Sequence, residues 1–303
     1  MSKSFKSIDS TISLVRRSKV QSLESCLKLF EALVSSVALY ASEVWAFEHL
    51  DQLDRLYNHF CKRLFMLSRL TAGYIIRLET GYYRLRQMII RRPVMYWLKI
   101  LDMTENRFPA KCYQLLLNNH HAMTGSRPKL VKSLKQLLDN LGFSFLWQYQ
   151  NAAMVRSYVP VLLQTLTDQM RCTDLTRLNN SSINAAYCAL NPASTRMLYL
   201  DNNALSLHVQ QLLFKLRLQS DNIYLDGRVY YFSADMECAF CARDSDTIKH
   251  FLKDCNFTCF LRNNDLQTLL NRFYSGHCNI SNTEQCLKLY RYALFCFNLR
   301  HAT

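Results

Sequence analysis

The residues best able to do chemistry lie close together between Glu237 and Cys255. Three cysteines and one histidine recur there in a C-x2-C-x8-H-x4-C pattern: Cys238, Cys241, His250 and Cys255. Thiolate and imidazole are ligands that Zn²⁺ favours, and a structural zinc ion takes four of them at the corners of a tetrahedron. Four protein ligands leave no position for water or substrate, so the pattern predicts a structural zinc site and no catalytic metal.

A turn and a short helix must position these ligands. Residues 244–247 are turn and N-cap types, which predicts a loop that leads into a short helix over Ile248–Lys253. Two alternatives stay open. The four residues are incidental in a chain with 12 cysteines, or Cys259, one helical turn beyond Cys255, substitutes for a ligand. Cys259 otherwise reads as a buried thiol, because free cysteine behaves as a small hydrophobe.

Composition indicates a large helical protein with an anionic partner. The chain has 303 residues, 50% of them hydrophobic, enough for one large or two modest domains. Only 6 Gly and 5 Pro occur, and scarce breakers favour long helices. The net charge of +14 favours nucleic acid, RNA or DNA, as the partner. The alternative is a solvated basic surface without a specific partner.

The N-terminus and the thiols point to a reducing compartment. The first ten residues, MSKSFKSIDS, lack the apolar core of a signal peptide. We therefore expect an intracellular, nuclear protein with reduced cysteines. The most apolar stretch, Leu29–Phe47, contains Glu31 and Glu43, and each charge at membrane depth costs about 2.5–3.5 kcal/mol. We expect a buried amphipathic helix there, no membrane partner and no small-molecule substrate.

Apolar spacing predicts a mainly α fold. Residues 11–47 are expected to form one or two helices whose buried stripe ends with Val37 and Tyr40. A second helix is predicted over Asp51–Leu70, and a third over Leu85–Leu101, where Pro93 marks a kink or the true start. Further helices are expected over Leu130–Leu141 with Gly142 as C-cap, Phe145–Met170 with a break at Pro160, Ala204–Gln219, Leu261–Phe273 and Cys286–Leu299.

The cysteine motif follows a predicted β-hairpin. Asp226-Gly227 stands between the apolar runs Ile223–Leu225 and Val229–Tyr231, a typical two-residue hairpin turn. Hairpin and motif are therefore expected to form one zinc-stapled unit. The predicted division of the chain is a helical region over 1–122, a linker over 123–129, a helical region over 130–220, the hairpin and knuckle over 221–260, and closing helices over 261–303.

One window carries more than half of the basic excess. Between Cys61 and Lys111 there are eleven basic and three acidic residues, with aromatic residues among them. Guanidinium groups suit phosphates and aromatic rings stack on bases, although such rings more often pack in a core. The predicted phosphate contacts are Lys62, Arg63, Arg84, Arg86, Arg91 and Arg92, with Arg243 and Lys249 beside the metal motif.

Motifs for catalysis are missing. The sequence has no G-x-x-x-x-G-K-[ST], no G-x-S-x-G and no H-E-x-x-H. The string Tyr224-Leu225-Asp226-Gly227 has Gly where a polymerase hairpin would place its second Asp. We therefore predict no catalytic residues in this chain.

Two parts of the chain resemble one family. The knuckle, with Leu216-Arg217 before it, resembles the zinc-knuckle region of reverse-transcriptase polyproteins from non-LTR (LINE-type) retrotransposons. Its matching steps are Asp246-Thr247, His250-Phe251 and Cys255. The N-terminal part resembles the segment that follows the family's polymerase palm. Its matching steps are Tyr40 to Trp45, Lys62-Arg63 and Glu79-Thr80-Gly81.

The resemblance spans roughly residues 10–260 and omits the palm with its catalytic aspartates. It implies a helical, thumb-like region and a knuckle that hold RNA and DNA without polymerising them. The expected function is nucleic-acid binding by a non-catalytic fragment. The alternatives are a zinc-stapled protein-interaction scaffold, an accessory subunit in reverse transcription, and a decayed reading frame.

Overall fold

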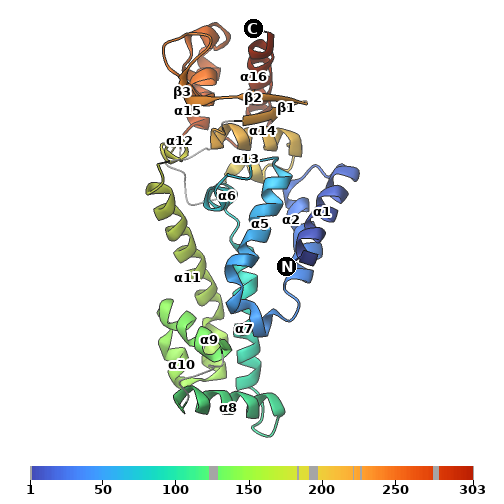
Figure 1. The fold of residues 1–303 in the computed structure, drawn as a ribbon, viewed down its shortest axis with the longest axis vertical. Helices are drawn as coiled ribbons and strands as arrows, with labels where there is room; N and C mark the ends of the chain where they lie inside the picture. Colours follow the sequence, from blue (N-terminus) through green and yellow to red (C-terminus); the bar gives the residue numbers. More distant parts are fainter. Residues whose placement is uncertain are drawn as a thin grey trace. The chain divides into compact units, whose positions relative to one another are not determined.

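The computed structural model describes residues 2–122, 129–182, 184–190, 197–220, 222–225, 227–275 and 280–302. The described chain is mainly helical, with two small antiparallel sheets (Figure 1), which confirms the predicted class. The predicted linker lies almost wholly outside these residues, because 123–128 are not described. Among the described helices none is long and apolar enough to cross a membrane by itself. Leu23–Ala38 and Ser42–Glu48 meet the length and composition only as a pair bent by 71°.

The helices of the N-terminal half run in this order: α1 (Ser2–Arg17), α2 (Leu23–Leu29), the π-helix η1 (Phe30–Ser35), α3 (Ser36–Ala38), α4 (Ser42–Trp45), the 3₁₀ turn η2 (Ala46–Glu48), α5 (Leu50–Leu64), α6 (Gly73–Thr80), α7 (Arg84–Leu101), α8 (Phe108–Ala122), α9 (Lys129–Asn140) and α10 (Ser144–Tyr149). α7 passes through Pro93 as one helix.

The C-terminal half contains α11 (Ala152–Asn179), α12 (Ala185–Cys188), α13 (Leu198–Asp201), α14 (Leu207–Leu218), β1 (Asn222–Leu225), β2 (Arg228–Tyr231), β3 (Ser233–Glu237), β4 (Ser245–Asp246), the π-helix η3 (His250–Asp254), the 3₁₀ helix η4 (Asn256–Leu261), α15 (Asn264–Phe273) and α16 (Thr283–Ala302). β1 pairs with β2, and β3 pairs with β4, both antiparallel.

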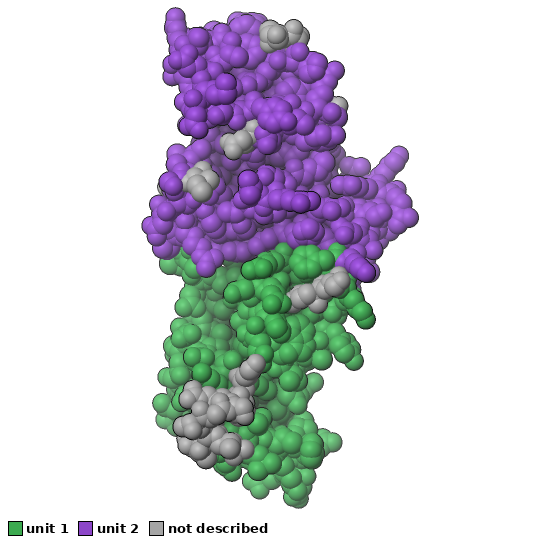
Figure 2. All heavy atoms as spheres, viewed as in Figure 1, with its two compact units in different colours: residues 1–5, 34–57, 83–173 green, residues 6–33, 58–82, 174–303 purple. Residues whose placement is uncertain are grey.

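The chain forms two compact units (Figure 2). Unit 1 consists of residues 1–5, 34–57 and 83–173, and unit 2 of residues 6–33, 58–82 and 174–303. Each unit is therefore assembled from segments that lie far apart in the sequence.

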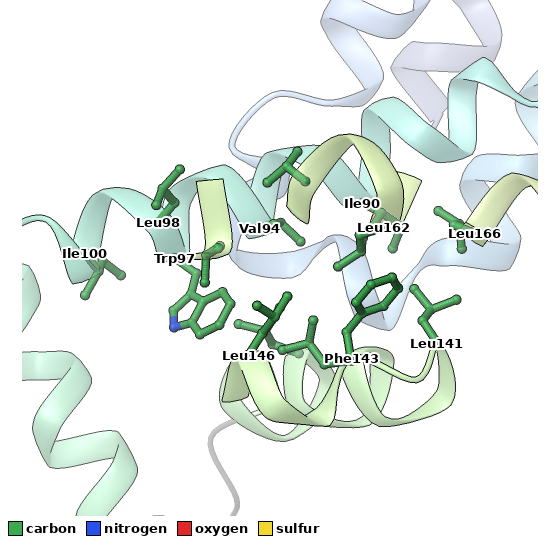
Figure 3. Packing of buried hydrophobic residues seen from close by; sticks show 14 of the residues in the cluster. Ile90, Val94, Trp97, Leu98, Ile100, Leu141, Phe143, Leu146, Leu162 and Leu166 are labelled. Atoms are coloured by element: carbon green, nitrogen blue, oxygen red, sulfur yellow. The ribbon is translucent and has the colours of Figure 1, made fainter. Parts of the chain in front are cut away.

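Unit 1 has its own hydrophobic core, to which α7, α9, α10 and α11 contribute (Figure 3). Trp97 on α7 is 2% exposed and stacks on Trp147 of α10 with ring centroids 6.0 Å apart. Its indole N–H donates to the hydroxyl of Tyr113 at 2.9 Å, and that hydroxyl donates to Gln150 at 2.9 Å. The polar atoms of these large side chains are thus satisfied inside the core.

Unit 2 is built around a buried ion pair. The side chains of Glu79 on α6 and Arg217 on α14 are 0% exposed, and the guanidinium Nε donates to the carboxylate at 2.6 Å. The hydroxyls of Tyr187 and Tyr199 donate to the same carboxylate at 2.6 and 2.7 Å. Arg217 also donates to the backbone carbonyl of Phe273, which links α14 to α15. A buried pair of this kind needs further hydrogen bonds, and here the two tyrosine hydroxyls and the Phe273 carbonyl supply them.

The predicted apolar stripe over residues 11–47 is wrong at its end. Phe30 and Val34 are buried, but Val37 is 45% and Tyr40 81% exposed. The π-helix η1 holds one more residue per turn than an α-helix, so the buried positions shift to Ala38 and Leu39. Turns at residues 18–22 and 39–41 also divide the segment into more helices than predicted.

The helix predicted over Asp51–Leu70 ends six residues early. Met66 adopts φ 51°, and the N–H of Leu67 donates to the carbonyl of Lys62 at 2.9 Å. This is the 6→1 hydrogen bond of a Schellman ending, which usually has glycine where Met66 stands. Gly142 fills the same role after α9 with φ 81°, and the N–H of Phe143 donates to Leu138 at 2.8 Å, which confirms the predicted cap.

The predicted break at Pro160 is also wrong. α11 is continuous through Pro160, and the chain breaks earlier, at Gln150, where φ is 46°. The side chain of Asn151 then accepts from the N–H of Met154 at 3.0 Å and so caps the new helix. By contrast, the predicted hairpin is confirmed, with Tyr224 opposite Val229 and Gly227 at φ 80°.

Candidate metal centre and basic helix face

Two strands and one π-helix bring the four predicted ligands together. Cys238 directly follows β3, and Cys241 lies in the tight turn before β4. His250 and Cys255 stand at the start of η3 and just after it. The one-residue excess of a π-turn is accommodated in a single hydrogen bond, from the N–H of Cys255 to the carbonyl of His250 at 2.7 Å.

The four ligand atoms lie close enough together to share one metal ion. All four lie within 4.8 Å of one another. The sulfurs of Cys238 and Cys255 are 3.9 Å apart, and the sulfur of Cys241 is 3.3 Å from Nε2 of His250. Bonds of about 2.3 Å to sulfur and 2.0 Å to nitrogen place tetrahedral ligands roughly 3.5–3.8 Å apart. The cluster can therefore hold a metal ion with little rearrangement.

The surroundings of the cluster orient its ligands. Nδ1 of His250 lies 3.6 Å from the carboxylate of Asp244, so that Nε2 faces the cysteines. The N–H of His250 donates to the hydroxyl of Thr247 at 3.1 Å, which begins the helical turn. The N–H of Cys238 donates to the carbonyl of Asp244 at 2.8 Å and closes the turn. A carboxylate behind a histidine ligand is a common feature of zinc sites.

The thiols differ in their readiness to ionise. Burial raises the pKa of the Cys255 thiol to about 12. Burial acts in the same direction on Cys241, but hydrogen bonds from the backbone of Arg243 and from Cys238 and Cys255 outweigh it and place its pKa below the usual value. A bound cation would stabilise the thiolate form of both groups.

Arg300 on α16 contacts residues that surround the cluster. Its guanidinium binds the carboxylate of Asp246 through both terminal nitrogens and donates to the carbonyl of Tyr231 at 2.9 Å. It also lies over the rings of Phe232 and Phe251, at 4.2 and 5.2 Å from their centroids. Sequence reasoning missed Arg300, because this residue follows the last candidate ligand, Cys255, by 45 residues and no local pattern connects the two.

Cys259 is neither a ligand nor buried, which corrects the expectation for this residue. It is exposed and does not belong to the group of four ligand atoms. It lies within the 3₁₀ helix η4, which begins directly after Cys255. The helix predicted over Ile248–Lys253 exists, but residues from His250 onward form the π-helix η3.

The predicted phosphate contacts on α5 and near the knuckle lie in unit 2. Lys62 donates to the carbonyl of Arg69 at 2.7 Å, and Arg63 is 3.2 Å from Asp9. Arg243 is exposed and Lys249 is partly buried. The segment over residues 221–262 contains seven acidic and five basic residues, so it adds nothing to the positive charge.

The predicted contacts on α7 lie in unit 1. Arg86 pairs with Asp54 at 3.2 Å, and Arg92 donates to the carbonyl of Leu39 and lies 3.9 Å from Glu43. Arg84 and Arg91 are exposed. Lys99, which sequence reasoning counted in the basic window without selecting it, is exposed eight residues after Arg91.

Arg91 and Lys99 differ from the paired cations of α7. Neither makes an ion pair or a hydrogen bond with any residue that the structure describes. Residues 83–173, the longest segment of unit 1, contain thirteen basic and four acidic residues. The arrangement suits an anionic ligand more than an internal salt bridge.

Comparison with protein-family models, with curated proteins and with solved structures finds no match for this chain.

Proposed function

We propose that this protein binds nucleic acid without catalysis and that a structural zinc ion stabilises its C-terminal knuckle. The observation that carries the proposal is a pair of cations on α7, Arg91 and Lys99, that have no partner within the described parts of the chain. They lie in a segment of thirteen basic and four acidic residues. Phosphates would supply the missing counter-charges, and release of their counterions would supply much of the affinity.

Zinc is the metal that best suits the cluster. Three thiolates and one imidazole form a soft donor set with tetrahedral spacing, which zinc shares with few other physiological ions. All four positions of the ion would be filled by Cys238, Cys241, His250 and Cys255. The metal would therefore hold β3, β4 and η3 together and would not activate water.

The proposed origin is the post-palm thumb and knuckle region of a LINE-type reverse transcriptase. One contact supports it beyond the letters of the sequence. Glu79, from the Glu-Thr-Gly step, and Arg217, from the Leu-Arg step, are 138 residues apart and form the buried ion pair of unit 2. Two motifs that carry the resemblance thus depend on each other physically. An accessory role in reverse transcription would show as primer extension that requires this chain in trans.

Binding of labelled RNA and DNA across a salt series tests the proposal. We expect the affinity for both to fall steeply between 50 and 200 mM salt, as it does for proteins that contact several phosphates. Arg91→Ala and Lys99→Ala should each lower the slope of log K against log salt by about 1. Arg156→Ala is the matched control, because Arg156 is exposed in the same unit but already pairs with Asp102.

A flat salt series, or equal effects of the control and the two test variants, would overturn the proposal. The metal is tested separately by counting zinc per chain in the purified protein with and without Cys238→Ser. Wild-type protein should hold about one ion per chain, and the variant should hold less.

The knuckle itself favours a second candidate function, the binding of a protein partner. Phe257 is 36% and Phe260 71% exposed, with ring centroids 6.3 Å apart. They lie in a segment without excess positive charge, so electrostatics gives nucleic acid no advantage there. Loss of a co-purifying protein upon Phe260→Ser, with salt-dependent nucleic-acid binding unchanged, would support this second function.

A further inference from the structure

Unit 1 has a groove beside α4 and α7 with a volume of about 580 Å³. Its apolar lining comes from Val44 on α4 and from Met88, Met95 and Tyr96 on α7. The volume falls within the range of sites that enclose small organic groups, about 300–1,000 Å³. Thioethers adapt their shape and attract aromatic rings, so this lining suits a flat aromatic group.

Positive charge lines the same groove. Arg91 and Lys99 contribute to its wall and lack partners among the described residues. The single acidic lining residue, Glu43, already lies 3.9 Å from Arg92. The charges left over for a ligand are therefore positive, which excludes a cationic occupant and favours a polyanion.

The spacing along α7 alternates cations and thioethers. Arg84, Met88, Arg91, Met95 and Lys99 follow one another at steps of three and four residues, so they share one side of the helix. At 1.5 Å per residue the row is about 22 Å long. A stacked strand advances about 3.4 Å per phosphate, so the row matches roughly six to seven nucleotides.

From this we infer that the groove binds a single strand of nucleic acid, with its phosphates on Arg91 and Lys99 and its bases against Met88, Met95 and Tyr96. A duplex stacks its bases on each other and presents mainly phosphates to the row, so it would gain nothing from the apolar lining. A single strand alternates both kinds of group, as the row does. This inference rests on the proposed function and specifies its ligand.

Fluorescence anisotropy with three labelled probes tests the inference: ten-nucleotide oligothymidylate, ten-nucleotide oligouridylate and a DNA hairpin duplex. The test variant is Met88→Gln/Met95→Gln, which keeps side-chain length but removes the apolar surface. We expect its affinity for both single strands to fall about tenfold, with duplex affinity unchanged. Met236→Gln, at an exposed methionine in unit 2, should change none of the three.

Each alternative outcome is decisive. Unchanged single-strand affinity in the double variant, with salt-dependent binding retained, overturns the inference and leaves the proposed function standing. Absence of binding to all three probes overturns both. A designed acidic Glu/Leu helix that binds more tightly than either single strand, and loses affinity in the same variant, would assign the groove to a protein partner and also overturn it.

A photo-crosslink provides a readout that does not depend on the variant's folding. Oligouridylate substituted with 5-iodouridine should crosslink to the tryptic peptide that contains Tyr96 in the wild-type protein. Crosslinks found only on peptides of unit 2 would contradict the placement of the strand on α7.

Discussion

At the scale of single residues, the most fully buried charges of unit 2 are Glu79 and Arg217, which form an ion pair. Each residue directly follows a leucine, Leu78 or Leu216, and no local pattern predicts that either charge is buried. Their burial follows from tertiary contacts alone, because Tyr187 and Tyr199 complete the hydrogen bonds of the carboxylate from two further elements. The sequence could predict which residues are basic and which types could bind a ligand. It could not predict which of the basic side chains are buried.

The first prediction concerns this pair. Arg217→Met should lower the free energy of unfolding of the full chain by about 3–5 kcal/mol, because it leaves the Glu79 carboxylate buried without its counter-charge. Arg63→Met removes an arginine whose ion pair with Asp9 is half exposed, and it should cost about 0–1 kcal/mol. Urea unfolding followed by circular dichroism measures both. Equal costs for the two variants would show that the buried pair is not the anchor of unit 2.

The second prediction is a pH dependence at Lys215, which is 3% exposed and donates to the carbonyl of Tyr224 at 2.9 Å. Burial lowers its pKa to about 8, against 10.5 for the free side chain. Between these values the unfolded chain binds the proton and the folded chain does not, so stability from this group rises with pH. From pH 7.5 to 10 the wild type should gain about 2 kcal/mol over Lys215→Met.

The free energy of unfolding is compared between the wild type and Lys215→Met at each pH. Contributions from other groups that titrate in the same range are the same in both proteins and cancel in the difference. Burial raises the pKa of the Cys26 thiol to about 11, which acts in the opposite direction in both proteins. A wild-type advantage that stays constant from pH 7.5 to 10 would show that Lys215 keeps an ordinary pKa in the fold.

At the scale of elements, helix existence could be predicted far better than helix ends. Periodicity located α5, α7, α9, α14, α15 and α16, because apolar residues recur in each of them at steps of three and four. It failed where backbone geometry departs from the α-helix without a glycine or proline signal. The π-helix η1 shifted the buried stripe, and Met66 ended α5 in a left-handed conformation that methionine seldom adopts.

The ends of α5 and α9 give a matched pair of variants for the third prediction. Met66→Gly should raise stability by about 0.5–1 kcal/mol, because glycine adopts φ 51° without strain. Gly142→Ala should lower it by about 1 kcal/mol, and this cost would come from the backbone alone, since an added Cβ meets nothing within 4 Å. Thermal unfolding of both variants decides it. A loss of stability in Met66→Gly would contradict this account of the helix end.

The fourth prediction links α16 to the metal site. Arg300→Ala should weaken zinc binding about 10–100-fold, because Arg300 fixes Asp246 and the rings beside the ligands without touching the ion. Arg291→Ala, on the exposed side of the same helix, should leave the affinity unchanged. Competition with a chromophoric chelator measures both affinities. The same affinity in Arg300→Ala and wild type would mean that the strands hold the ligands unaided.

At the scale of the whole molecule, each unit draws on segments that the sequence separates. Spacing predicted which three cysteines and one histidine come together in a cluster that could hold a metal ion, because they lie within 18 residues of chain. It could not predict that residues 34–57 and 83–173 share one core while residues 58–82 belong to another. That partition depends on which apolar faces meet, and local periodicity contains no information about the partner of a face.

The partition leads to the fifth prediction, on metal removal. The four candidate ligands of the proposed zinc ion all belong to unit 2, whereas the core of α7, α9, α10 and α11 belongs to unit 1 and includes none of them. Chelation should therefore abolish amide-exchange protection in the knuckle from residue 233 to 262. It should leave protection in α7, α9 and α11 unchanged, because the core formed by these helices contains none of the candidate ligands.

Hydrogen exchange read by mass spectrometry, with and without chelator, resolves the two regions in one experiment. The same comparison on Cys238→Ser separates loss of the ion from any effect of the chelator. If the helices of unit 1 lost protection together with the knuckle, the two cores would form one cooperative body, and the zinc ion would support the nucleic-acid groove as well as its own module.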